Sequence, residues 1–428
     1  MPSASANYRT LLRTPGAAAF FLPAAVGRLG IAMTGIGIVW LVHARTGSYA
    51  AAGLVTGGFA VADAVAGPQI GRLVDRFGQS RVLLGALGAH AGAVALLLAG
   101  AVPNVVAGVL VGATLPQLGA LSAARWSALL SGERAAALPT AFALEALANG
   151  VSYLAGPALV SVLGAAGHPG AGVLLAAALV VGGGFVLAVQ RRTTPPLSDH
   201  AERRHAGRAL LRSAFLRQVA LGLALGVFFG ATQVSVAAYA VGRGTPDEAA
   251  LLYCASNCTN LVGGWAYGAR RRGGSLPHHQ AAAAACLTLA SLPLAFLDAP
   301  LAVGATLALT GLAVPVLLIL TSVLTESSVP RAVLTQAFTW GNSASAAGVA
   351  GAAAVAGRVV DAGGAHGGFG VAAGAAVMMA VLALSGLRGS SPDAARPSAL
   401  TQAVGPGAGN REASADASAR TRRGSCHR

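Results

Sequence analysis

Long apolar stretches, separated by short polar or charged ones, repeat along almost the whole chain. Twelve of them, in two sets of six, approach the roughly 20 residues that a helix needs to cross a bilayer. The ten-residue alternation typical of membrane β-strands does not occur, so the pattern predicts helices. We expect them at residues 17–43, 50–70, 82–101, 104–125, 139–163, 170–190, 213–241, 249–269, 280–297, 301–324, 334–357 and 369–387.

The polar breaks divide the chain into five parts. Residues 1–16 form a polar tail, and six-helix bundles are predicted at 17–190 and 213–388. Between the bundles, residues 191–212 carry six arginines and two adjacent prolines, which is typical of a solvated linker. Residues 389–428 combine Gly, Ser, Pro and Ala without apolar periodicity, which predicts a disordered tail.

Composition agrees with a membrane protein. Of the 428 residues, 55% are hydrophobic and only 10% are charged, and the mean hydropathy is +0.66. A soluble globule needs more polar surface than this, so the sequence predicts an all-α polytopic membrane protein. No segment remains that could form a separate soluble catalytic domain.

The net charge of +15 has a topological explanation. All 29 basic residues are arginines. If the helices alternate in direction, 25 of these arginines fall on the side that holds both tails. Cytoplasmic loops are enriched in arginine, so we expect both termini in the cytoplasm and the chain in the plasma membrane. Nucleic acid is therefore not an expected partner.

The residues that could bind metals or catalyse reactions are few. Four cysteines occur, three of them inside apolar stretches, and their spacing matches neither a disulfide framework nor a zinc site. No single segment groups Ser, His and Asp or pairs two carboxylates. We therefore expect no metal, no cofactor and no enzymatic activity.

The segment between the second and third apolar stretches reads G-R-L-V-D-R-F-G-Q-S-R. It resembles the loop between helices 2 and 3 of the major facilitator superfamily of secondary transporters. The resemblance implies a transporter with twelve helices in two six-helix bundles, built from inverted repeats and working by alternating access. The matching positions are Gly71, Leu73, Asp75, Arg76, Gly78 and Arg81.

This segment predicts a conformational gate. Gly71 allows close helix approach, and Gly78 permits a turn that other residues resist. Asp75 is expected just past the end of the second helix. The eleventh helix begins on the same side near Leu334, so its positive N-terminal dipole could face the Asp75 carboxylate. We expect Asp75 to act as a latch, with a simple topology signal as the alternative.

Three charged residues stand out inside predicted helices, where a charge costs roughly 2.5 to 3.5 kcal/mol. Counting 1.5 Å per residue places Arg28 roughly 16 Å deep, and Asp63 and Glu145 roughly 12 Å deep. They could meet. One hypothesis makes Glu145 or Asp63 a proton carrier for coupled transport. The alternative is a buried ion pair that fixes packing, and the sequence leaves both open.

Neutral polar and aromatic residues stand out in the second half. A binding cavity lined by neutral polar and aromatic side chains suits an amphipathic ligand. The predicted substrate contacts are Phe228, Phe229, Gln233, Asn257, Trp340 and Asn342.

In the fifth helix, Gly156-Pro157 matches part of the family's antiporter signature, while Ser152 and Val160-Ser161 depart from its glycines. The partial match favours a kinked helix and gives weak support to export.

The sequence therefore predicts a monomeric exporter of small amphipathic compounds. Without any lysine the chain cannot form a nucleotide-binding P-loop, so ATP does not drive it directly. The energy comes from an ion gradient, with protons as one candidate, or from the gradient of the substrate. The alternatives are a nutrient uptake permease and a membrane sensor or scaffold that does not transport.

Overall fold

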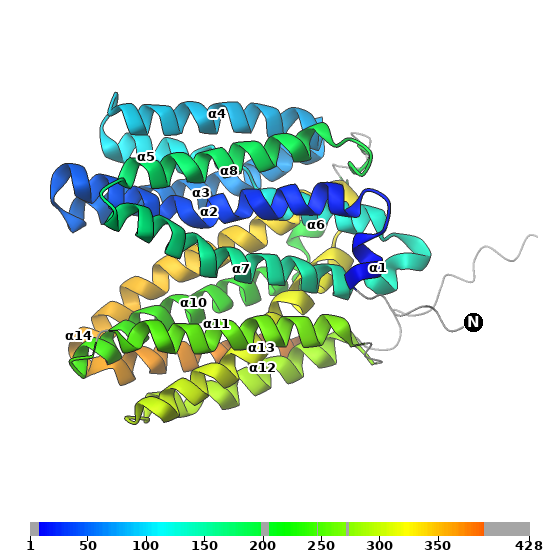
Figure 1. Cartoon of the computed structure of the whole chain (residues 1–428). Helices are drawn as coiled ribbons and strands as arrows, with labels where there is room; N and C mark the ends of the chain where they lie inside the picture. Colours follow the sequence, from blue (N-terminus) through cyan, green and yellow to red (C-terminus); the bar gives the residue numbers. More distant parts are fainter. Residues whose placement is uncertain (1–7, 198–204, 246, 271–273, 389–428) are drawn as a thin grey trace, which may run out of the picture. The chain divides into compact units, whose positions relative to one another are not determined.

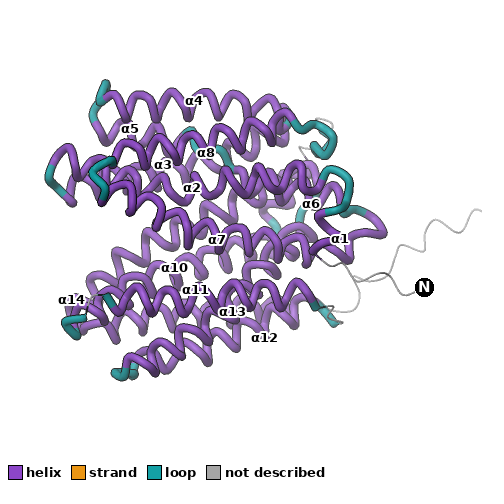
Figure 2. The backbone as a smooth tube through the Cα atoms, in the orientation of Figure 1, coloured by secondary structure: helices purple, strands orange, loops and turns teal. Residues whose placement is uncertain are grey.

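The computed structural model describes residues 8–197, 205–245, 247–270 and 274–388. Within these residues every regular element is a helix (Figure 2). The predicted tail at 389–428 lies outside the described residues, as do residues 198–204 of the predicted linker.

Two groups of helices follow one another in sequence. In Figure 1 the helices of the first half lie above those of the second. The first half contains α1 (Tyr8–Leu12), α2 (Ala17–Thr46), α3 (Tyr49–Phe77), α4 (Gln79–Ala99), α5 (Asn104–Ala113), α6 (Leu118–Leu129), the 3-10 helix η1 (Gly132–Ala137), α7 (Leu138–Ala165) and α8 (Pro169–Val189). The second half contains η2 (Arg208–Leu211), α10 (Ser213–Gly242), α11 (Glu248–Ala269), α12 (Leu276–Ser291), η3 (Leu292–Ala295), α13 (Pro300–Ser328), η4 (Arg331–Val333) and α14 (Leu334–Arg388).

The helices confirm the predicted architecture. Nine stretches of the described chain are long and apolar enough to cross a membrane. One of them, Arg331–Leu387, contains two helices, because Gly364 interrupts α14 with a φ of 71°. Adding α11 and α12, which are more polar or shorter, gives the twelve crossings expected from the apolar pattern.

The fourth crossing differs from the prediction. The sequence predicts one helix at 104–125, but α5 ends at Ala113 and α6 begins only at Leu118. Pro116 lies in the break, where proline cannot donate a helical hydrogen bond. The helix also continues to Leu129, so Arg125 belongs to α6 rather than to the charged connection that the sequence predicts.

The hydrophobic cores show where the two halves are joined. We call the end of the bundle where α3 stops the Asp75 end, and the end where α2 stops the Arg45 end. At the Asp75 end one buried core includes Val74 and Phe142 of the first half and Leu334 and Phe338 of the second. At the Arg45 end each half has its own core. The halves are therefore packed together at the Asp75 end.

Glycines bring α10 and α14 into close contact within the second half. A Cβ atom on Gly226 would collide with the backbone carbonyl of Ser345, and one on Gly230 would lie 3.0 Å from the Cα of Val349. Small residues allow such backbone approach in membrane helices, where packing replaces the hydrophobic effect as the driving force for association. The α10–α14 pair depends on these missing side chains.

We predict that Gly226→Ala lowers the thermal stability of the purified protein. The added methyl group forces α10 away from α14, and overpacking of this kind costs about 1–3 kcal/mol. Thermal unfolding in detergent measures the effect. Gly57→Ala in α3 is the matched control, because a Cβ there meets nothing within 4 Å. Equal melting temperatures for the two variants would contradict the prediction.

Candidate functional site

The predicted gate segment is mostly helical. Asp75 lies in the last turn of α3, not past its end as predicted, because α3 continues to Phe77. The turn is a single residue, Gly78, with a φ of 91° that favours glycine. Directly after it, α4 begins.

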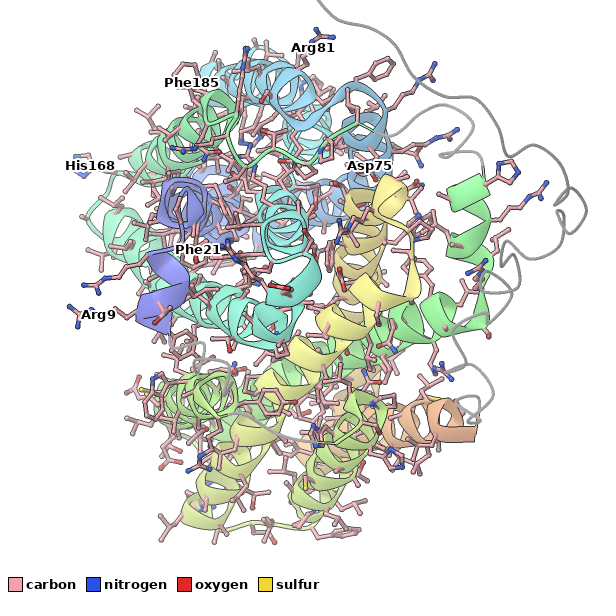
Figure 3. All side chains as sticks on the ribbon, turned by 90° about the vertical axis from the view of Figure 1, so that its right-hand side faces the viewer. Arg9, Phe21, Asp75, Arg81, His168 and Phe185 are labelled. Carbon is pink, nitrogen blue, oxygen red and sulfur yellow. The ribbon has the colours of Figure 1, made fainter. Side chains whose placement is uncertain are left out.

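Asp75 connects the two halves of the chain. Its Oδ2 accepts a hydrogen bond from the backbone N–H of Gln336 at 2.9 Å. Gln336 lies in the first turn of α14, where backbone N–H groups have no partner within the helix. The carboxylate thus supplies both an acceptor and the negative charge that the helix N-terminus favours. Figure 3 shows Asp75 beside the ribbon of the second half.

Gly71 makes this contact possible. A Cβ atom at Gly71 would collide with the Thr339 hydroxyl and lie 3.0 Å from the Cα of Gln336. Only a glycine lets α3 and α14 approach this closely. Two of the three arginines of the segment were predicted to take part in gating, and neither is part of this bond: Arg76 is exposed with its guanidinium 4.9 Å from the Phe77 ring, and Arg81 points outward (Figure 3). A gating role for these two arginines stays a prediction.

Arg125 is a buried residue that the sequence analysis misplaced. Its side chain is fully buried and donates hydrogen bonds to Gln79 Oε1 at 2.8 Å, Leu187 O at 2.9 Å and Gln190 O at 2.8 Å. It joins α6 to the start of α4 and the end of α8. The structure thus places one more arginine inside the first half. Its position in an apolar helix was the signal from which its burial could have been predicted.

Arg28 and Glu145 meet, as the depth count suggested. Their side chains form a buried ion pair between α2 and α7. Glu145 also accepts hydrogen bonds from Ser122 Oγ at 2.5 Å and Trp126 Nε1 at 2.8 Å. Arg28 donates further to Asn149 Oδ1 at 3.3 Å. Three helices, α2, α6 and α7, are therefore held by one carboxylate.

Asp63 is not part of this ion pair. Its Oδ1 accepts a hydrogen bond from Gln117 Nε2 at 2.9 Å. Gln117 is the residue before α6, so the carboxylate lies at the break in the fourth crossing. Among the described residues, the ion pairs of the protein do not include Asp63. Asp63 is half-buried and its partner is neutral.

The predicted helix-5 residues lie in α7. Pro157 is inside this helix, which runs without interruption from Leu138 to Ala165. A Cβ atom on Gly156 would lie 3.1 Å from the Cβ of Ala32 in α2. Close packing of Gly156 on α2 is thus observed, while a kink at Pro157 stays a prediction.

The predicted substrate contacts of α10 and α11 differ in exposure. Phe228 is only 3% exposed and belongs to a core cluster of the second half. Phe229 and Asn257 are half-buried, and the side chain of Gln233 is exposed. The position of Phe228 favours packing, so its role as a contact needs a rearrangement of this core.

Trp340 and Asn342 lie on different faces of α14. Phe338 contacts Phe142 of the first half with ring centroids 5.7 Å apart. Asn342, one turn further along, lies on about the same face, whereas Trp340 lies about 200° around the helix from Phe338. Trp340 is 41% exposed. Asn342 is exposed as well, so a role as substrate contact stays a prediction for both residues.

The described residues contain no group of three or more His, Cys, Asp or Glu that could hold a metal ion. The Sγ atoms of Cys254 and Cys258 lie 3.8 Å apart on one exposed face of α11.

Three solved structures that resemble this chain are membrane transporters with different cargoes. The human organic anion transporter MFSD10 (TETRAN) has a TM-score of 0.66 at 17% identity and covers 86% of this chain and 98% of its own. An outward-facing bacterial homologue of the iron transporter ferroportin reaches 0.70 at 12% identity, with coverage of 86% and 98%. FucP in its outward conformation reaches 0.64 at 16% identity, with coverage of 86% and 99%.

At these identities the similarity establishes the fold and not the substrate. No curated protein sequence matches the chain. A family profile described as Major Facilitator Superfamily matches residues 20–348, which is most of the helical region. The chain therefore belongs to the major facilitator superfamily and is a multi-pass secondary transporter rather than an enzyme.

Proposed function

We propose that this transporter exports small amphipathic compounds from the cytoplasm across the plasma membrane, with the Asp75 end as its cytoplasmic gate. The hydrogen bond from Gln336 to Asp75 carries the proposal, because it joins the two halves at the end where they share a core. We call this bond the first latch. Alternating access requires it to break whenever the Asp75 end opens.

The arginine distribution supports this orientation. The side that holds both tails and the Asp75 end carries most of the arginines, as expected for a cytoplasmic face. With that face closed and separate cores at the Arg45 end, the structure fits an outward-facing state. Two of the similar structures are described as outward-facing.

Asp63 is the better of the two candidates for a proton carrier. Glu145 is buried and already holds an ion pair with Arg28 and two hydrogen bonds, and this set of contacts accounts for a packing role. Asp63 has one neutral partner and lies at a break in a helix, a position where transporters place ion sites. We therefore assign proton coupling to Asp63 and a packing role to the Arg28–Glu145 pair.

The proposed substrate class rests on the predicted contact residues of the second half, which carry no charge. Gln233, Asn257 and Asn342 are neutral amides, and the side chains of Gln233 and Asn342 are exposed. Neutral polar groups among apolar ones suit ligands with weak polarity. The similar structures carry an organic anion, iron and fucose as their named cargoes, so their likeness does not select among substrates.

We predict that cells producing the protein tolerate higher concentrations of at least one class of amphipathic toxic compound than cells without it. An exporter lowers the internal concentration of its substrate. Growth on a broad panel of such compounds measures this, with the Asp75→Asn protein as the impaired reference. Equal tolerance across the panel would contradict export, whereas faster entry of a nutrient would favour the uptake permease.

We predict that Asp75→Asn increases the ratio of open to closed conformations at the Asp75 end about fivefold. Replacing a charge-assisted bond by a neutral one costs the closed state about 1 kcal/mol. The alkylation rate of Ala337→Cys, at a fully buried position, measures opening in a background without other cysteines. Asp361→Asn, an exposed carboxylate, is the control. If Asp75→Asn leaves the alkylation rate unchanged, the first latch is contradicted.

We predict that Asp63→Asn leaves the amount of membrane protein unchanged but makes transport insensitive to pH. Glu145→Gln has the opposite profile, since it leaves Arg28 buried without its carboxylate partner, at a cost of about 3–5 kcal/mol. Protein level and pH dependence of efflux are measured for both. Transport by Asp63→Asn with the pH dependence of the unsubstituted protein would refute the assignment.

A further inference from the structure

The two halves meet along two seams at the Asp75 end. One seam lies between α3 and α14 and is closed by the first latch. The other lies between α7 and α11. The sequence after α11 reads R-R-R-G-G-S and contains no acidic residue, so this second seam has no counterpart of Asp75. The second seam needs another means of closure.

Two hydroxyl groups of the first half bond to the end of α11. Tyr8 Oη donates to the backbone carbonyl of Trp265 at 3.1 Å, and to that of Gly264 at 3.4 Å. Thr140 Oγ1, in the first turn of α7, donates to the carbonyl of Gly268 at 3.0 Å. Since α11 ends at Ala269, the Gly268 carbonyl has no partner within its own helix. Thr140 supplies the missing donor.

Packing fixes these groups in position. Next to Tyr8 on α1, Leu11 is only 3% exposed and belongs to the core shared by both halves. A Cβ atom on Gly268 would lie 3.0 Å from Tyr8 Cζ and would collide with the Cβ of Ala143. The residue at 268 therefore has to be glycine for α1, α7 and α11 to fit together.

The polarity of the bonds matches the helix ends that they reach. The N-terminus of α14 is electropositive, and it is bound by a carboxylate acceptor. The C-terminus of α11 is electronegative, and it is bound by hydroxyl donors. Each seam thus carries the type of group that its helix end favours.

We propose that Tyr8 and Thr140 form a second latch that closes the α7–α11 seam and has to open together with the first latch during transport. This inference rests on the proposed gating at the Asp75 end. It assigns a conformational role to α1, a helix of five residues that precedes the first membrane crossing. Tyr8 and Thr140 are positioning residues, because they act on the gate and not on the substrate.

The second latch does not respond to pH near neutrality. Burial raises the pKa of the Tyr8 hydroxyl to about 12. Its stabilising contribution is complete below the usual tyrosine pKa of about 10 and is lost only as the pH rises through about 12. Thr140 does not titrate. Proton-driven steps therefore have to act elsewhere in the protein.

Distances between spin labels test the proposal. In the full chain with its cysteines replaced, labels at Arg134 on η1 and Ser327 on α13 report separation of the halves at the Asp75 end, since both side chains are exposed. Pulsed electron paramagnetic resonance in lipid nanodiscs gives the open and closed populations. Tyr8→Phe and Thr140→Val each increase the ratio of open to closed about fivefold, the effect of losing one neutral hydrogen bond. The double variant shifts it further.

Two control variants remove the same types of hydroxyl group at positions away from the seam. Tyr49→Phe removes the hydroxyl of a tyrosine that is 70% exposed at the Arg45 end. Thr56→Val removes a hydroxyl that bonds to Ala52 O within its own helix at 2.8 Å. Both controls keep the parental distances. A third seam variant, Gly268→Ala, opens the seam by collision while both hydroxyl groups remain.

The outcomes separate the second latch from the gate itself. Unchanged distances in the Tyr8→Phe/Thr140→Val protein, together with a shift in Asp75→Asn, would overturn the second latch and leave the proposed gate standing. If none of these variants shifts the distances, both proposals fail. A shift in Gly268→Ala alone would show that packing closes this seam without the hydroxyl bonds, and it would also overturn the second latch.

Discussion

The ends of membrane helices leave backbone groups without partners, and this constraint organises the Asp75 end of the protein. A group of this kind that is buried away from water costs free energy unless another part of the chain binds it. Here the partners come from the opposite half: Asp75 binds the first turn of α14, and Thr140 binds the last turn of α11. Closing this end therefore satisfies groups that are exposed when it opens, so that closure and backbone hydrogen bonding are coupled.

Two buried charged side chains in the first half also find their hydrogen-bond partners on other helices. Glu145 of α7 receives bonds from two helices, α2 and α6, and Arg125 of α6 donates to oxygens of α4 and α8. The two networks share α6, which contains Ser122, Trp126 and Arg125. These polar contacts add to glycine contacts of the kind that join α10 and α14, which the first half has as well, for example where Gly30 lies against the Ala176 carbonyl.

Much of the fold was predictable, because the apolar pattern and the arginine distribution follow directly from the thickness and polarity of a membrane. The contact of Asp75 with the eleventh helix could be predicted from a loop motif and a helix dipole. The break before α6 and the buried position of Arg125 could not, since an apolar stretch of normal length conceals both. The seam contact of Tyr8 was also unpredictable, since it joins residues about 256 positions apart in sequence.

The short helix α6 links two places that are otherwise separate. The N-terminus of α6 follows Gln117, which binds Asp63. Its C-terminal half holds Arg125, which binds Gln79 at the start of α4. Residues 117 and 125 are about 12 Å apart along the helix axis. The two ends of this short helix therefore bind residues of α3 and α4. Asp63 and the gate segment at the α3–α4 turn share one structural support, so a substitution that displaces α6 disturbs both.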